Sequence, residues 1–474
     1  MNGADKKKMG GIALKAGFWY VISSVLVRAV SIITTPIFTS LMTTEEYGIT
    51  ATFSSWHTLL LTLCTFNLSY SIERAKMDYS KEYDKYIGSM QVLSALITGI
   101  FVVIAVIFIE PLAKILELST WGVVLLLMYL FFTPPITFAQ HGFRFKYRYK
   151  ENIMIAWYIP LTTVVLSLVL MLNLDGDKSV YRMVGITIPT VFLGLYFWYK
   201  AFSKRNLNTN MEYWKYGLKL SAPLIVHTVS MNILYQADRV FIAKICGPSD
   251  TGIYSLVYNY GILLSVVTTS IGDGWLPWFH DSYYAKDYEN IRKNVKWIIV
   301  LGCYVGLACI ALAPEAILIL GGESYMGGVY CIPPIVLGIV SQFVYTHYVN
   351  IEMHLKKTKY VSMGTIMAAL LNIVLNMLFI PAFGYIAAAY TTMISYLFLL
   401  IVHFCVTILF LKIELYNDWF MFGSLAATMI VSAVLMVSYT YARIRYGLLA
   451  VGLLSFLFVF RKYIMRFVYR VLKK

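Results

Sequence analysis

Charged residues are scarce in this chain, because aspartate, glutamate, lysine and arginine make up only 13% of its 474 positions. Soluble domains carry roughly 25%, so this composition excludes an ordinary soluble protein. Hydrophobic residues make up 59%, and the mean hydropathy is +0.70. They stand in long runs, which are typical of membrane-spanning helices rather than of the alternating strands of a barrel. We therefore predict an all-α polytopic membrane protein.

Cysteine is scarce as well, with six residues and no C-x-x-C pair. Every cysteine lies in or beside an apolar run, so we predict neither a disulfide framework nor a metal site. The sequence also lacks the paired carboxylates and the large external loop that a membrane glycosyltransferase or polysaccharide polymerase would need. We expect a protein that is not an enzyme and that uses no cofactor.

The apolar runs predict about 14 transmembrane helices. Four of these spans have polar faces, and they lie near residues 15–42, 48–71, 217–246 and 251–273. The longest connection, residues 274–295, mixes aromatic and charged side chains, and we expect it to be a separate helix on the inner membrane surface. Asp273 and Glu352 lie at inner span ends, where we expect both carboxylates to be solvated.

The net charge of +15 follows membrane topology. With the N-terminus placed in the cytoplasm, the inner segments hold 31 lysines and arginines and the outer loops hold 5. This asymmetry follows the positive-inside rule, so we expect both termini to be cytoplasmic. It leaves little reason to expect nucleic-acid binding, whereas membrane lipids are expected partners.

The chain contains an internal repeat of about 205 residues. Residues 79–86 match residues 284–291 in their aromatic, basic and acidic positions, and Gly48-Ile49 matches Gly252-Ile253. The repeat unit therefore holds six spans, which predicts two pseudo-symmetric six-helix lobes with a site between them. We assign residues 1–205 to an N-lobe, 206–412 to a C-lobe, and 413–474 to two additional spans and a basic tail.

The stretch from Tyr216 to Gly247 is long enough to span a bilayer, yet it has a polar face. That face carries Ser221, Thr228, Asn232, Tyr235 and Arg239. Unpaired polar groups in hydrocarbon are costly, so the face must look at a wet cavity or at other helices.

The spans that the repeat relates to this stretch have polar faces too. In the first span the face carries Ser24, Arg28, Ser31 and Thr35, with Arg28 near the middle of the membrane. In the second it carries Thr50, Ser54, Thr58 and Thr65, with His57 beside it, and in the eighth it includes Tyr258. Together these faces predict a large hydrophilic cleft.

This layout resembles the polysaccharide flippases of the multidrug/oligosaccharidyl-lipid/polysaccharide exporter superfamily, which includes the O-antigen-type flippases. The resemblance rests on three features of the sequence. They are Gly17-Phe18-Trp19 with Arg28, Pro36 and Glu46-Tyr47-Gly48; Asp238-Arg239 followed by Gly252-Ile253-Tyr254; and the duplicated inner loop.

The resemblance implies a bacterial cell-membrane protein that moves an undecaprenyl-diphosphate-linked oligosaccharide from the inner to the outer leaflet. A diphosphate needs cations and sugars need hydroxyl partners and aromatic faces, which agrees with the predicted cleft. The candidate substrate-binding residues are Ser24, Arg28, His57, Asn232, Tyr235, Asp238, Arg239, Lys244 and Tyr258.

Several alternatives stay open. The chain is also compatible with a small-molecule or multidrug antiporter of the same superfamily, although that would favour an acidic cleft, or with a flippase for a peptidoglycan-precursor lipid. Arg239 and Asp238 could be a structural pair, Lys244 an outer anchor, and His57 a satisfied core histidine. Coupling to H⁺ or Na⁺, and partnership with a polymerase and glycosyltransferases, are left open.

Overall fold

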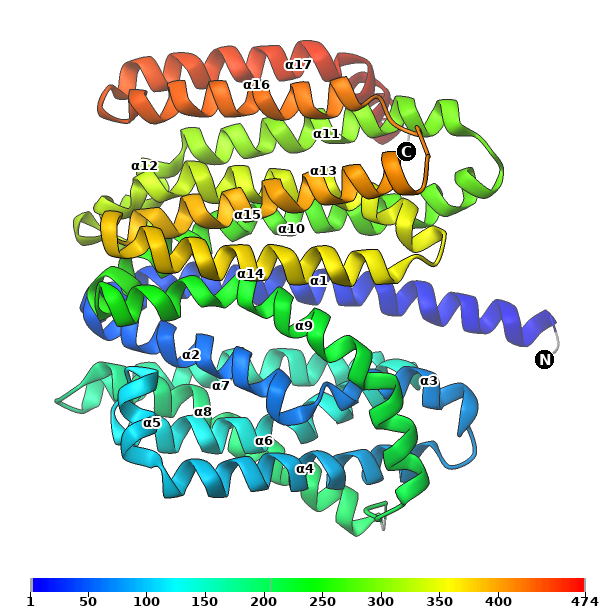
Figure 1. The fold of residues 1–474 in the computed structure, drawn as a ribbon, viewed down its shortest axis with the longest axis vertical. Helices are drawn as coiled ribbons and strands as arrows, with labels where there is room; N and C mark the ends of the chain where they lie inside the picture. Colours follow the sequence, from blue (N-terminus) through cyan, green and yellow to red (C-terminus); the bar gives the residue numbers. More distant parts are fainter. Residues whose placement is uncertain (1–2, 205, 473–474) are drawn as a thin grey trace. The chain divides into compact units, whose positions relative to one another are not determined.

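A computed structural model describes the backbone of residues 3–204 and 206–472. Within these ranges it describes all side chains except those of residues 3–18, 20, 21, 223, 462–464, 466–468 and 470–472. Gly17 and Phe18 begin the first family-like motif, and they thus lie outside the residues whose side chains are described. In the part of the chain that is described, every regular element is a helix, and the all-α prediction is confirmed (Figure 1).

The chain divides into two compact units, Met1–Gly252 and Ile253–Lys474, which we call the N-terminal unit and the C-terminal unit. The helices up to the division are α1 (Gly3–Leu41), α2 (Thr44–Thr65), α3 (Ser71–Asp78), α4 (Tyr83–Ile107), α5 (Ile109–Leu116), α6 (Thr120–Phe145), α7 (Tyr149–Asn173), α8 (Lys178–Ser203) and α9 (Met211–Ile245). Helix α10 (Pro248–Tyr284) crosses it. The helices beyond it are α11 (Tyr288–Ala311), α12 (Ala313–Gly321), α13 (Ile332–His354), α14 (Thr358–Phe383), α15 (Tyr385–Cys405), α16 (Asp418–Val437) and α17 (Ala442–Leu472). The lobe boundaries after residues 205 and 412 rest on the sequence repeat and stay predictions.

Each of the predicted spans falls on a helix, but the helices differ in how apolar they are. Among the described residues, 12 helical segments are long and apolar enough to cross a membrane. Helices α2 and α9 are not among these segments, although they have 22 and 35 residues. These are two of the spans whose polar faces the sequence had singled out. Polar surface on a spanning helix must find partners, and the contacts of α2 and α9 show which ones.

The N-terminal unit is a helix bundle in which α8 packs on α6 and α7, α1 packs on α7, and α9 packs on α2. Its core includes Phe53 on α2, Val123 and Leu126 on α6 and Met183 on α8, all buried. The start of α2 is fixed by a capping box, because the Thr43 hydroxyl accepts from the Glu46 amide while the Glu46 carboxylate accepts from the Thr43 amide. Its end is fixed by Phe66 and Asn67, which both adopt left-handed backbone conformations.

In the C-terminal unit, α13 is the central helix, in contact with α15, α11, α16 and α14. Within its candidate span 83% of the residues are buried, against 11% for the span in α17. Helices α16 and α17 both pack on α11, and they are the two additional C-terminal helices that the sequence predicted.

One sequence-based expectation about the inner surface is wrong. Residues 274–295 do not form a separate surface helix, because α10 continues without a break to Tyr284 and α11 begins at Tyr288. Pro277 does not end α10, so the aromatic residues after it belong to the last turns of a long helix.

Within the N-terminal unit, Lys146 forms an ion pair with Asp84. This pair joins the first turn of α4 to the residue that follows α6.

Candidate functional site

Helices α2 and α9 run antiparallel and are joined by hydrogen bonds between uncharged side chains. Ser55 Oγ donates to Gln236 Oε1 over 3.0 Å, and Asn232 Nδ2 donates to Thr62 Oγ1 over 2.7 Å. Just beyond the end of α2, Asn67 Nδ2 donates to Thr228 Oγ1 over 3.1 Å. We call these six residues the α2–α9 seam. The polar face of α9 is therefore satisfied, at least in part, by another helix.

At the opposite end of α2 the backbones approach closely. A Cβ added to Gly48 would lie 1.7 Å from the carbonyl oxygen of Pro248, and one added to Gly252 would lie 2.0 Å from that of Thr44. No side chain fits at either position. The hydroxyls of Thr44 and Ser249 are 2.7 Å apart and share a hydrogen bond beside this contact.

Arg239 is held at the edge of the seam. It is 6% exposed, and its Nη1 donates to the carbonyl oxygen of Tyr235 over 3.0 Å and to Gln236 Oε1 over 3.1 Å. Gln236 Oε1 therefore accepts from both Ser55 and Arg239. Asp238, the next residue along α9, is 1% exposed. Asn232, Tyr235 and Arg239 thus lie together along one helix, whereas the exposed Lys244 lies near its end.

Ser24 and Arg28 are placed differently. Both are exposed on α1, and Arg28 makes no ion pair or hydrogen bond with another described residue. Further along the same helix, the Thr35 hydroxyl donates to the Ser31 carbonyl over 2.7 Å. Among the described residues, this part of the α1 face therefore exposes a hydroxyl and an arginine without a partner.

The predicted polar face of α2 is not the face that meets α9. Ser54 is exposed and donates to the Thr50 carbonyl over 2.9 Å, as serines on uncovered helix faces commonly do. His57 points toward α6 instead. Its Nε2 is 3.1 Å from Thr133 Oγ1, and its ring stacks on Tyr129 with centroids 3.5 Å apart. His57 has the contacts of a core histidine.

Tyr258 lies on α10 in the C-terminal unit, where it is 4% exposed and contacts the ring of Tyr254 at a centroid distance of 5.8 Å. Its contact with substrate stays a prediction made from the sequence.

Among the described residues, no cluster of three or more histidines, cysteines, aspartates or glutamates is arranged to hold a metal ion.

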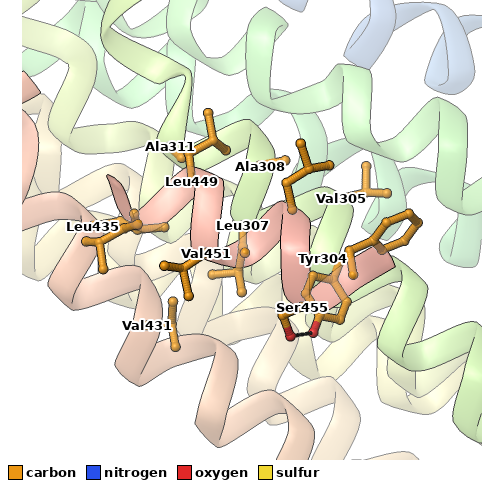
Figure 2. A pocket seen from close by; sticks show the side chains of 14 residues that line it. Tyr304, Val305, Leu307, Ala308, Ala311, Val431, Leu435, Leu449, Val451 and Ser455 are labelled. Carbon is orange, nitrogen blue, oxygen red and sulfur yellow. Dashed lines mark hydrogen bonds between the residues drawn. The ribbon is translucent and has the colours of Figure 1, made fainter. Parts of the chain in front are cut away.

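An apolar groove of about 610 Å³ lies between α11, α16 and α17 (Figure 2). Its walls are aliphatic and aromatic, and they include Ala308, Val431, Leu449 and Val451. The hydrogen bond between Tyr304 Oη and Ser455 Oγ, 2.6 Å long, joins α11 to α17 beside it. This shape and chemistry suit a hydrocarbon chain.

Carboxylates on α3 and just before α4, together with tyrosines at the start of α9, form a second polar region in the N-terminal unit. The Tyr216 hydroxyl donates to Asp78, and this bond, followed by the ion pair with Arg74, lowers the pKa of the Asp78 carboxyl against some opposing desolvation. The Tyr213 hydroxyl donates to Glu82 over 2.6 Å and lowers the pKa of that carboxyl. Both carboxyls are highly exposed to solvent, so these bonds orient the segment without a large stabilising effect.

The expectation that the Glu352 carboxylate is solvated is wrong. Glu352 is 0% exposed, and its Oε1 lies 2.8 Å from Nδ1 of His403 on α15. Asp273, by contrast, is exposed as expected. A carboxylate at the end of an apolar run gave no hint of a partner 51 residues away. The signal that could have found it is the rarity of ionisable residues inside such runs.

The 12 apolar helical segments among the described residues are those of a multi-pass membrane protein. The family model described as polysaccharide biosynthesis protein matches residues 13–282, more than half of the chain, and a MatE model matches residues 223–378. The chain therefore belongs to the polysaccharide biosynthesis protein family, within the multidrug/oligosaccharidyl-lipid/polysaccharide exporter superfamily of flippases and transporters.

Solved structures share this fold at low sequence identity. A lipid II flippase MurJ in an inward closed conformation is 14% identical, with a TM-score of 0.70 over 94% of this chain and 100% of that one. An inward-facing multidrug-resistance MATE transporter is 13% identical, with a TM-score of 0.60 over 86% and 95%. A transporter of the same superfamily from Pyrococcus furiosus is 14% identical, with a TM-score of 0.56 over 86% and 94%.

A curated relative from Haemophilus influenzae, "Lsg locus putative protein 1", is 19% identical over 228 residues. The match covers 46% of this chain and 56% of that protein. The chain thus spans little more than half the length of this relative.

Proposed function

We propose that this protein moves an undecaprenyl-diphosphate-linked oligosaccharide from the inner to the outer leaflet of a bacterial cell membrane for surface polysaccharide synthesis. The observation that carries the proposal is Arg28, an exposed cation in an apolar helix that has no ion-pair or hydrogen-bond partner among the described residues. A diphosphate carries at least two negative charges, and it cannot cross hydrocarbon without a partner. A guanidinium stays protonated and grips phosphate oxygens with two hydrogen bonds.

The other candidate residues extend this proposal. The exposed hydroxyl of Ser24 lies one helical turn before Arg28 and suits a sugar or phosphate oxygen. Asn232, Tyr235, Asp238 and Arg239 are proposed as the part of the site contributed by α9. His57, Lys244 and Tyr258 remain predictions with weaker support. The apolar groove beside α17 suits an isoprenoid or acyl chain, which can stay in the membrane while the head group moves.

A peptidoglycan-precursor lipid is a second candidate, because it has the same diphosphate chemistry and the fold matches a protein described as a lipid II flippase. A small-molecule antiporter is favoured less, because an exposed arginine would repel cationic drugs. Cytoplasmic termini, H⁺ or Na⁺ coupling, and a polymerase and glycosyltransferases as partners stay proposals alongside the main one.

The test is surface polysaccharide in a deletion strain that carries each variant at matched expression. Arg28→Ala is expected to lower export about tenfold to a hundredfold, since a charge-assisted hydrogen bond contributes about 1.5–3 kcal/mol. Arg28→Lys keeps the charge but loses the two-pronged geometry, so partial export is expected. Arg443→Ala, which removes an exposed arginine of α17 outside the candidate site, is the matched control and should leave export unchanged.

Wild-type export by Arg28→Ala would refute the role of this arginine. Normal surface polysaccharide in the deletion strain, together with a defect in peptidoglycan, would favour the second candidate substrate. These two results are independent of each other, so the site and the substrate are tested separately.

A further inference from the structure

Glu352 and His403 form a buried ionisable pair near the ends of α13 and α15. Their side chains are 0% and 1% exposed, and Oε1 and Nδ1 lie 2.8 Å apart. The second carboxylate oxygen, Oε2, is also buried and has no hydrogen-bond partner among the described residues. In a membrane protein an ionisable residue in such a place calls for a functional explanation.

The free-energy cost of burying the Glu352–His403 pair depends on the number of protons that it binds. With one proton between Oε1 and Nδ1, and another on Nε2, the pair is neutral and its hydrogen bond is made. Removing one proton leaves a net negative charge on a carboxylate whose Oε2 has no donor, which is costly in a dry interior. Adding one places a neutral carboxyl beside an imidazolium, whose net positive charge is then buried without a counter-charge. The neutral pair is therefore the stable form in the described packing.

The surroundings of the pair are close-packed. The ring of Tyr345, from α13, stacks on the imidazole with centroids 5.5 Å apart. On α14 the facing residue is Gly364, where an added Cβ would lie 3.2 Å from His403 Nε2. The backbone of α14 thus lies against the ring and leaves little room for water in the described state.

The titratable groups on the neighbouring elements include two histidines of α13. His347 is 1% exposed, and neither of its ring nitrogens has a hydrogen-bond partner among the described residues. His354 Nδ1 lies 2.8 Å from Nδ1 of His280 on α10. Tyr348, on α13, donates to Asp418 of α16 over 2.7 Å. Tyr416, before α16, donates to the His347 carbonyl over 3.2 Å. On α11, Arg292 donates to the Leu415 and Glu414 carbonyls. Beyond the end of α13 lie the exposed lysines Lys356, Lys357 and Lys359.

We propose that the Glu352–His403 pair is a proton-binding site of the C-terminal unit, with a neutral loaded form and a negatively charged unloaded form. The exchanged ligand is a single proton. Unloading requires water or another donor to reach Oε2, so the inner ends of α13 and α15 must separate. Proton occupancy is thereby tied to helix packing.

The use of this site rests on the proposed function. A protein that moves a charged lipid against its preferred distribution needs an energy source, and an exchanging proton supplies one. One charge that crosses a potential of about 100 mV supplies about 2.3 kcal/mol, equivalent to about a fiftyfold ratio.

The first test needs no substrate. The full-length protein in lipid nanodiscs is titrated from about pH 8 to about pH 5, and infrared difference spectra record carboxyl protonation. We expect a buried carboxyl band that disappears in Glu352→Gln and shifts its titration in His403→Gln. Asn372→Ala is the control, because it removes another buried bond of this unit, the 3.1 Å bond to Thr392, without removing a titratable group. A spectrum unchanged by Glu352→Gln would overturn the proposal.

The second test concerns coupling. In cells at matched expression, Glu352→Gln is expected to lower export by up to about fiftyfold and to abolish its dependence on the proton gradient. Asn372→Ala is expected to keep that dependence. Export by Glu352→Gln with the wild-type response to an uncoupler would overturn the coupling role. Since the infrared band is measured without substrate, failure of the flippase assignment would be recognised separately.

Discussion

The α2–α9 seam and the groove beside α17 show two ways in which helices meet in this protein. In the seam, three side-chain hydrogen bonds join the α2 segment to α9, and at the start of α2 the backbone contacts α10 closely at Gly48. At the groove, leucine, valine and alanine face one another across about 610 Å³ of space (Figure 2). One contact is closed and the other remains open.

The difference follows from the solvent. Lipid tails are as apolar as leucine, so two aliphatic helix faces gain little by leaving lipid for each other. Small residues allow close approach, and polar groups find in each other the partners that lipid lacks. Polar patterning therefore marks where helices are fixed, and aliphatic patterning marks where a lipid chain can enter.

The largest expected effect comes from filling the closed contact. Gly48→Ala places a methyl group 1.7 Å from the Pro248 carbonyl oxygen, so the backbones must move apart. We expect a loss of about 1–3 kcal/mol in the free energy of unfolding. Gly423→Ala on α16 is the control, since its added Cβ meets nothing within 4 Å and alanine favours a helix. Thermal unfolding in detergent compares the two, and equal stability would contradict the close contact.

The second-largest loss of stability is expected when the charge of Arg239, beside the seam, is removed. Arg239→Met keeps the long apolar stem but loses the hydrogen bonds to the Tyr235 carbonyl and to Gln236. Because one partner is charged, we expect a loss of about 1.5–3 kcal/mol in stability. Arg28→Met is the matched change at an exposed arginine, and it should alter stability by no more than about 0.5 kcal/mol. If both variants unfold alike, the contrast between the two arginines is wrong.

A smaller effect is expected within the seam itself. A double-mutant cycle with Asn232→Ala and Thr62→Ala isolates the 2.7 Å bond between the two helices. Hydrogen bonds of this kind in membrane proteins average about 0.6 kcal/mol, and we expect a coupling energy near that value. Unfolding measured in lipid bicelles gives the cycle, and strict additivity would show that the bond contributes nothing.

The smallest effect on stability is expected at the groove. Ala308→Leu points added carbon into existing space, so the free energy of unfolding should stay within about 0.5 kcal/mol of wild type. The same variant should bind less lipid, as measured by lipids retained after purification. A large loss of stability would show that the groove is narrower than described.

The sequence predicted the helices well and their contacts poorly. Long apolar runs reveal a span wherever it lies, and the repeat relates α2 to the start of α10. Helical periodicity also found the polar face of α9, but it could not say that Ser55 and Thr62 cover part of it. A pattern along one helix identifies a face and not the neighbour that packs on it.

The same limit explains Glu352. From the sequence it stood at the inner end of a span, which favours solvation. Its burial depends on His403, which lies 51 residues away on α15. Arg28 is the opposite case, because its place in the middle of an apolar run was visible from the sequence and its exposure agrees with the proposed role. Its contact with substrate remains to be tested.

The contact at Gly48 also reflects the internal repeat of the chain. The repeat equates Gly48 with Gly252 and, at the same spacing, Thr44 with Pro248. Gly48 meets Pro248 while Gly252 meets Thr44, so each copy touches the counterpart of the residue that touches it. Such reciprocity is the signature of an isologous interface between two identical subunits. The starts of α2 and α10 therefore meet as two copies of the same surface would, although both belong to one chain.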